Sequence, residues 1–387
     1  MKRAVIMPSY MQDFKCIASE CEETCCAGWY IAIDEATYKK YKKVKVPEMK
    51  KRLEKDLVVK KGQVGGALAA KIKLKNNRCA FLAKDNLCDI YTQLGESYLS
   101  ETCKMYPRNT NQVGEQVELS LALSCPEAAR QILLREKPIL FKEETLGKLP
   151  IVGAHLKINL KDPKYFEDFI IPIRKIIIEV LQDKQLTFKE KWQCLEVIMT
   201  KLNAYKLRQD IKKLQVFLKA MQNKEYQSYK ETDLSVESKR LLSDVGAARL
   251  FEALNKLRET KKWSSLRYAK CYEKLLEGIG DTFNEKAYKQ GEKIYEVEFI
   301  KHFSYILENY FVNYVYERLV PLNQKTPLES FQEMTLYLAL LKLHLIGELS
   351  TNEQIQTEEI VACIQSFTRV FDHNELYMQQ IKKYIKA

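Results

Sequence analysis

Residues 21–29 read CEETCCAGW, so three cysteines fall within six positions and two of them are adjacent. Five more cysteines surround this stretch before residue 126, whereas only three lie beyond it. All four histidines also lie beyond residue 126. A metal bound in the first third of the chain would therefore have a ligand shell made wholly or almost wholly of thiolates. The candidate ligands are Cys16, Cys21, Cys25, Cys26, Cys79, Cys88, Cys103 and Cys125.

Cysteine density of this kind indicates metal binding or catalysis when the compartment is reducing. Disulfides and ordinary buried thiols are the alternatives, and the spacing alone does not decide between zinc and an iron–sulfur cluster. Neighbouring side chains diverge, so we expect Cys25 and Cys26 to serve different partners. Cys125 precedes Pro126, which favours the first position of a helix, and a helix N-terminus favours the thiolate form.

Composition limits the class of protein. The chain has 387 residues, 46% of them hydrophobic and 29% charged, which suits two soluble domains. No apolar run approaches the ~20 residues that a membrane-spanning helix needs. The apolar run before Pro8 is also too short for a secretory signal. We therefore predict a cytoplasmic protein with no membrane partner.

The positive charge of the chain is concentrated in one region, residues 39–78. This region holds fifteen Lys or Arg and three acidic residues, a surplus of twelve that equals the net charge of the whole chain, +12. It can be a solvated pair of helices, or it can dock an acidic protein substrate by charge complementarity. Nucleic-acid binding is disfavoured, because beyond Tyr41 the region offers no aromatic residues for base stacking. We predict no nucleic-acid partner.

Local patterns predict a mainly α protein with a small β-hairpin. Asp34 is a helix N-cap, Pro47 either interrupts that helix or begins a second one, and alternation after Asn109 predicts the hairpin. Thr187 and Glu190 form a capping box that opens a longer helix. From these patterns we predict a cysteine-rich metal-binding domain over residues 1–145, followed by an all-helical domain over residues 146–387.

Three stretches carry a resemblance to a known family. They are FKCIASECEETCCAGWYIAID (residues 14–34), RCAFLAKDNLCDIYTQLGESYLSETCKMYPR (78–108) and LSLALSCPEAAR (119–130). Together they resemble the flagellin lysine-N-methylase family, which is related to small zinc- or iron-chelating domains marked by CxxCxxCC. The likeness covers the first third of the chain, and ENYFVNYVYERLVP (308–321) is the most family-like stretch of the remainder.

The resemblance implies an enzyme, a protein lysine N-methyltransferase that moves a methyl group from S-adenosylmethionine to lysine ε-amino groups of flagellin. It also implies a [4Fe-4S] cluster on the eight cysteines, with zinc as the alternative. Trp29, Tyr91 and Arg108 are the implied cofactor-binding neighbours, and the catalytic residues are unknown. Flagellin is the implied partner, and docking by the basic region 39–78 is one of the interpretations of its charge given above. A non-catalytic zinc- or iron-binding adaptor, or a redox or iron-handling protein, remains open, because no Gly-rich loop typical of a donor site is evident.

Overall fold

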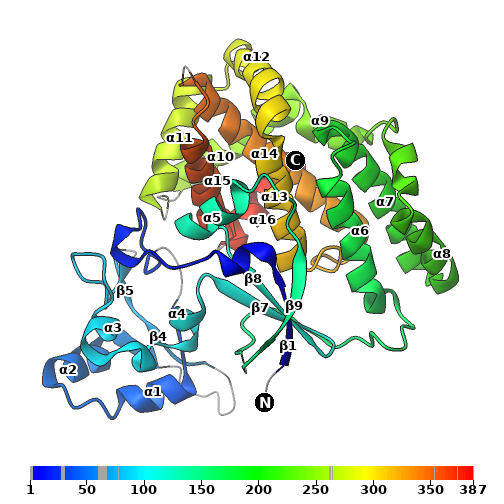
Figure 1. Cartoon of the computed structure of the whole chain (residues 1–387). Coiled ribbons are helices and arrows are strands. Elements are labelled where there is room, and N and C mark those ends of the chain that lie inside the picture. The colour runs from blue at the N-terminus through cyan, green and yellow to red at the C-terminus, as the bar shows by residue number, and fades with distance from the viewer. Residues whose placement is uncertain are drawn as a thin grey trace.

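A five-stranded sheet lies between the cysteine-bearing region and the helical part of the molecule (Figure 1). The computed structural model describes residues 3–27, 31–59, 68–76, 78–147, 149–260, 263, 265–352, 354–372 and 374–386. The strand order is β10-β7-β8-β1-β9. The strands are β1 (Arg3–Pro8), β7 (Arg108–Val113), β8 (Gln116–Leu121), β9 (Phe141–Leu146) and β10 (His155–Leu156).

Strands β7 and β8 form the antiparallel hairpin that the alternation after Asn109 predicts, with Val113 opposite Gln116. Gly114 in the turn has φ +59°, a left-handed conformation that glycine adopts without steric cost. The hairpin prediction is confirmed.

The sequence patterns gave no sign of β1, β9 and β10, because these strands pair with distant partners. β1 runs parallel to β8 and antiparallel to β9, and β10 runs parallel to β7. The sheet therefore includes strands on both sides of residue 145. The domain boundary near that residue stays a prediction.

A smaller unit with its own core carries most of the cysteines. The β2-β4-β3 sheet and the β5-β6 pair enclose buried residues such as Ile33, Met49 and Phe81, and three thiols pack against this core. Its elements are β2 (Ala32–Asp34), α1 (Glu35–Tyr41), α2 (Pro47–Asp56), β3 (Leu57–Val59), β4 (Leu68–Ile72), β5 (Leu74–Lys75), β6 (Arg78–Cys79), α3 (Asp89–Leu94) and α4 (Glu101–Met105).

The predicted cap of α1 is confirmed, and it also fixes α4. The Asp34 carboxylate accepts hydrogen bonds from the Thr37 backbone N–H at 2.8 Å and from the Glu101 N–H at 3.0 Å. One side chain thus satisfies exposed donors at two helix starts, which brings α1 and α4 together.

Beyond residue 160 the regular structure of the described chain is helical, as predicted, and one further helix lies earlier, between β8 and β9. The helices are α5 (Pro126–Leu133), α6 (Ile170–Gln182), α7 (Phe188–Arg208), α8 (Ile211–Gln222), α9 (Val236–Leu242), α10 (Asp244–Thr260), α11 (Leu266–Ile279), α12 (Glu285–Ile294), α13 (Lys301–Glu317), α14 (Pro327–Ser350), α15 (Thr357–Phe371) and α16 (Glu375–Lys386). A π-helical segment, Tyr295–Ile300, joins α12 to α13. Short 3-10 turns are Ser9–Gln12, Ala18–Glu20, Glu96–Tyr98, Phe166–Phe169 and Glu225–Tyr229.

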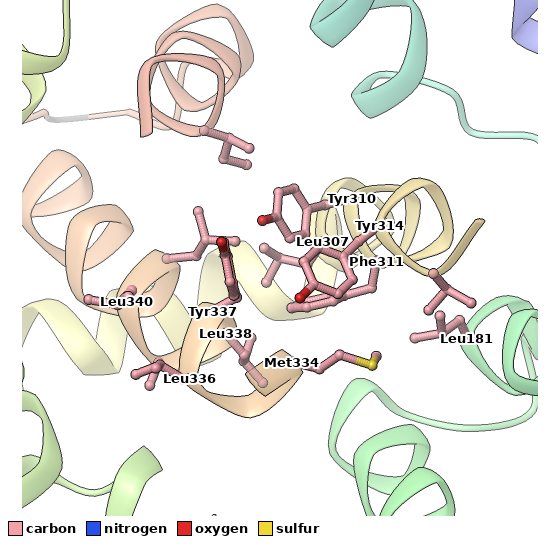
Figure 2. Close-up of a cluster of buried hydrophobic side chains, with 14 of the residues drawn as sticks. Leu181, Leu307, Tyr310, Phe311, Tyr314, Met334, Leu336, Tyr337, Leu338 and Leu340 are labelled. Atoms are coloured by element: carbon pink, nitrogen blue, oxygen red, sulfur yellow. The ribbon is translucent and has the colours of Figure 1, made fainter. Parts of the chain in front are cut away.

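Helix α14 forms the centre of this region and is buried along nearly its whole length. Figure 2 shows aromatic and aliphatic side chains of α13 and α14 meeting there, with Tyr310, Tyr314 and Tyr337 side by side. Fully burying one large apolar side chain contributes about 1.5–3 kcal/mol, so this core is the main source of the region's stability. None of the described helices has the length and hydropathy needed to cross a lipid bilayer.

Candidate metal centre

Five of the eight predicted ligand cysteines converge on one side of the smaller unit. Cys25 and Cys26 lie in a turn, Cys79 ends β6, Cys88 precedes α3, and Cys103 lies within α4. Their thiols act electrostatically on one another: the pKa of Cys26 responds to Cys25, Cys79 and Cys103, and that of Cys79 responds to Cys25, Cys88 and Cys103. We call these five residues the thiol cluster.

The other three cysteines form a looser group between the thiol cluster and α5. The pKa of Cys125 responds to Cys21 and Cys16, and that of Cys21 responds to Cys16 and Cys25. None of the eight cysteines forms a disulfide within the described residues.

Backbone hydrogen bonds fix the framework of the thiol cluster. The Cys79 N–H donates to the Cys26 carbonyl at 2.7 Å, which ties the turn to β6. The Phe81 N–H donates to Cys79 Sγ at 3.4 Å, and the Ser100 hydroxyl accepts from the Cys103 N–H at 3.2 Å. Segments far apart in the sequence are thereby held in one place without a metal.

The side chains of Cys25 and Cys26 do not diverge as expected, whereas the expectation that they serve different partners stays a prediction. Their sulfurs lie 3.9 Å apart. Two thiolates on one tetrahedral zinc ion, each bonded at about 2.3 Å, stand about 3.8 Å apart. The tight turn at these residues rotates both side chains toward each other, and the pair has the spacing of two ligands.

The complete ligand shell is not assembled in this conformation. Among the described residues, no three Cys, His, Asp or Glu side chains stand ready to hold a single metal ion. A change of χ1 rotamer moves a cysteine sulfur by about 3 Å, which is the scale of adjustment that side chains on a fixed backbone allow. The donor set therefore fits a thiophilic metal in chemistry, and one pair fits it in spacing.

Burial controls the protonation of these thiols. It raises the pKa of Cys79 to about 12 and that of Cys103 to about 11, because a buried thiolate loses its hydration. Cys25 differs: the hydrogen bond from Cys26 lowers its pKa to about 7, against the effect of burial and with help from the positive charge of Arg369, while the pKa of Cys26 rises. A bound metal cation would offset the cost of burying these thiolates, since metal binding releases thiol protons.

Cys125 does precede a helix that begins at Pro126, as predicted. Backbone N–H groups at that helix start lower its pKa, but burial outweighs them and raises the pKa to about 12. The expected preference for the thiolate is therefore not met, because the side chain is desolvated.

A second set of residues, which the sequence patterns did not single out, holds the CEETCC turn. Arg369 of α15 is buried and donates to the Thr24 carbonyl at 2.7 Å and to the Ala27 carbonyl at 2.6 Å. Its Nε lies 3.2 Å from Glu23 Oε1, and Gln365 donates to the other Glu23 oxygen at 2.9 Å. We call this contact the α15 clamp, and it fixes the thiol pair against the helical region.

The predicted cofactor neighbours are placed differently. Trp29 lies outside the described residues. Tyr91 lies in the first turn of α3 with its side chain exposed, and its N–H is directed at Cys88. Arg108 begins β7 and stacks over the Phe14 ring at 5.2 Å, away from the hydrogen bonds that fix the thiol cluster. Their role as cofactor-binding residues stays a prediction.

Comparison with known proteins agrees with this architecture. Residues 15–126 match a family described as "Putative zinc- or iron-chelating domain", with the motif name CxxCxxCC. The amino-terminal part is thus similar to this class of cysteine-rich domain. Residues 174–387, more than half of the chain, match the FliB lysine N-methylase C-terminal domain, and the chain belongs to the FliB lysine N-methylase family.

Three relatives are similar over part of the chain. The lysine-N-methylases of Salmonella choleraesuis and Salmonella typhimurium are each 30% identical over 161 residues, which is 40% of this chain and 40% of each relative. The flagellar biosynthetic protein FliU of Salmonella muenchen is 32% identical over 129 residues, 33% of this chain and 76% of that protein. No solved structure matches the chain.

Proposed function

We propose that this protein is a lysine N-methyltransferase that modifies flagellin with S-adenosylmethionine as methyl donor. Membership of the FliB lysine N-methylase family supports the activity, and the flagellar name of one relative supports the substrate. The observation that carries the proposal is the convergence of five thiols from four separate segments in a chain of this family. The eight cysteines form no disulfide among the described residues, which suits a reducing compartment, so we propose that the protein acts in the cytoplasm.

We further propose that Cys25, Cys26, Cys79, Cys88 and Cys103 supply the ligands of a metal centre, a [4Fe-4S] cluster with zinc as the alternative. Such a centre, when bound, would supply a soft cationic site where the cysteine-bearing unit meets the helical region. Backbone hydrogen bonds hold the thiols near one another before a metal binds, and the α15 clamp holds the Cys25–Cys26 turn. Cys16, Cys21 and Cys125 form the outer group and complete the predicted set of eight.

The decisive experiment combines metal analysis with an activity assay. The full chain is purified without oxygen, and its iron, sulfide and zinc are quantified. It is then incubated with flagellin and methyl-labelled S-adenosylmethionine, and label in flagellin lysines is counted. Iron with sulfide and labelled lysines supports the proposal.

Bound metal without label in flagellin would instead favour a non-catalytic metal-binding adaptor. The α15 clamp gives that alternative a structural basis. A metal bound at a turn that a helix already holds can serve only to stabilise the fold.

A further inference from the structure

A polar cavity of about 650 Å³ lies where the end of α13 meets α14, the end of α15, α16 and strand β7. Its mouth is beside Gln379, whose side chain is exposed. The cavity lies outside the thiol cluster. It includes the end of the ENYFVNYVYERLVP stretch, whose polar residues the proposed metal centre leaves unexplained.

The cavity wall carries one uncompensated negative charge when all its ionisable groups are charged. Its described lining has three acids, Glu317, Glu333 and Asp372, and two bases, Arg318 and Lys382. Both bases already have partners, because Arg318 lies 2.7 Å from Asp372 and Lys382 lies 2.8 Å from Glu333.

Glu317 is the one acid of the described lining that pairs with neither of these two bases. Among the described side chains no base forms an ion pair with it, and its carboxylate accepts one hydrogen bond, from Asn313 Nδ2 at 3.3 Å. Burial raises the pKa of Glu317 to about 7; Arg318 opposes this rise and Asp372 adds to it. Burial raises the pKa of Tyr10, the negative charge of Glu317 raises it further, and the positive charge of Arg135 lowers it.

Aromatic rings surround the charged groups. Tyr337 lines the cavity, and the Arg318 guanidinium lies 4.8 Å from the Tyr314 ring and 5.4 Å from the Tyr337 ring. The hydroxyls of Tyr310 and Tyr314 are buried, and within the described part of the chain neither has a hydrogen-bond partner. Both hydroxyls are close enough to Arg318, which lines the cavity, to influence its pKa.

The backbone at this point is also unusual. Leu319, which lines the cavity, has φ +59°, a conformation that costs a non-glycine residue about 1–3 kcal/mol. Such strain persists where surrounding structure holds it, and it is concentrated at functional sites.

Helix α15 connects the cavity to the metal centre. Arg369 holds the Cys25–Cys26 turn, and Asp372 at the end of the same helix lies in the cavity wall. The two residues are separated by about 4.5 Å along the helix axis. A group bound in the cavity would therefore lie close to the junction where the thiol pair is fixed.

We propose that this cavity receives the ε-ammonium group of the substrate lysine, with Glu317 as the base that accepts its proton. The inference rests on the proposed methyltransferase function. An N–H bond of the ammonium breaks, the proton bonds to a Glu317 carboxylate oxygen, and the nitrogen keeps the electron pair. That pair then forms the N–C bond to the donor methyl group, while the C–S bond of the sulfonium breaks and its electrons remain on sulfur. The carboxylate is active when it is deprotonated, so activity should rise with pH through the pKa of Glu317.

The test compares full-length wild-type protein with Glu317→Gln, which keeps the side-chain size and removes the base. We expect the kcat/KM for flagellin to fall about 100-fold and its rise with pH near 7 to disappear, because a general base typically contributes 10²–10⁴-fold. Glu317→Asp, which keeps a carboxylate, should retain the pH-dependent rise. Glu273→Gln, at an exposed position on α11, is the matched control and should behave as wild type.

A binding assay separates this inference from the proposed activity. The probe is n-butylammonium chloride, which reproduces the end of a lysine side chain, and calorimetry measures its affinity without methyl donor. The affinity should fall about tenfold in Glu317→Gln but not in Glu273→Gln, equivalent to loss of one charge-assisted contact. If flagellin is never methylated but this difference persists, the ammonium site stands and the proposed activity fails. Unchanged probe affinity and an unchanged pH profile in Glu317→Gln would overturn the inference, and circular dichroism of Glu317→Asp checks that the cavity still folds.

Discussion

At the scale of single residues, burial decides the protonation state of the groups that matter most. Cys79, Cys103 and Glu317 all have a raised pKa because the charged form loses hydration. Cys25 is the exception in the thiol cluster, since a sulfur neighbour and an arginine stabilise its thiolate. Most of these side chains are therefore protonated and neutral when no cation is bound near them.

Glu317 gives a pH-dependent contribution to stability whose sign is fixed. Its pKa is about 7 when folded and 4.5 ordinarily, so between these values the unfolded chain releases a proton that the folded chain retains. The free energy of unfolding of the wild type should therefore fall as pH rises through this window and level off above it. Glu317→Gln lacks this effect, so its stability relative to wild type should increase by about 1–3 kcal/mol from pH 4 to pH 8. Urea unfolding at both pH values measures the difference, and equal pH dependence in the two proteins would contradict it.

Single-cysteine variants test the thiol cluster. Structural zinc in small peptides contributes about 10–16 kcal/mol through four ligands, so losing one ligand should lower metal affinity at least ~100-fold. We expect this loss for Cys26→Ser, measured by competition with a chelator. Cys194→Ser is the control, because Cys194 is buried in α7 and donates to the Tyr226 carbonyl far from the cluster. Equal metal affinity in the two variants would remove Cys26 from the ligand set.

At the scale of elements, the α15 clamp links the cysteine turn to the helical region. Arg369→Gln would remove two hydrogen bonds to the turn and leave the partly buried Glu23 without its cation. We expect a loss of about 3 kcal/mol in unfolding free energy and faster hydrogen exchange in residues 22–27. Metal affinity should fall about tenfold, as for other residues that orient metal ligands.

The control for this variant is Arg249→Gln, on the exposed face of α10. It should change neither exchange in the turn nor metal affinity. If Arg369→Gln also left the turn protected, the clamp would have no role in holding the thiol pair.

Elements with local signals were predictable from the sequence. The Asp34 cap, Gly95 after α3 with φ +85°, and the capping box of Thr187 with Glu190 are each complete within a few residues. Propensity and capping chemistry decide such ends without reference to the rest of the fold.

Elements and sites built from distant residues were not predictable in the same way. Strand β1 pairs with β8, which lies more than a hundred residues later in the sequence. Arg369 is a single arginine in an amphipathic helix, and nothing in the local sequence indicates that it binds a distant turn. One signal was available for the cavity: Asn309, Asn313 and Glu317 recur every four residues within an apolar helix. That spacing indicates a buried polar stripe, and the structure places its last member at the cavity.

At the scale of the whole molecule, charge is distributed unevenly. Within the basic region 39–78, Lys43 in the segment between α1 and α2 is exposed, and so are Lys50 and Lys51 of α2. These helices lie beside the thiol cluster at one end of the molecule (Figure 1). An acidic protein substrate would be attracted to this end.

Reversing these charges should slow substrate capture. In Lys43→Glu/Lys50→Glu/Lys51→Glu we expect kcat/KM for flagellin to fall about tenfold at low ionic strength, with the difference shrinking as salt is added. The control Lys212→Glu/Lys219→Glu/Lys293→Glu makes the same change in net charge at exposed positions on α8 and α12. Equal losses in both triple variants would mean that net charge, rather than this surface, governs encounter.

The Tyr10 hydroxyl donates to Asn313, a partner 303 positions away. Ribosomes add about 5–20 residues per second, so roughly 15–60 s pass between the synthesis of these two residues. During that interval strand β1 and the first cysteines lack their neighbours in the helical region, among them Arg369 of α15, which holds the Cys25–Cys26 turn. Newly made thiols are then open to metal ions, and equally to oxidants, before the helical part can cover them.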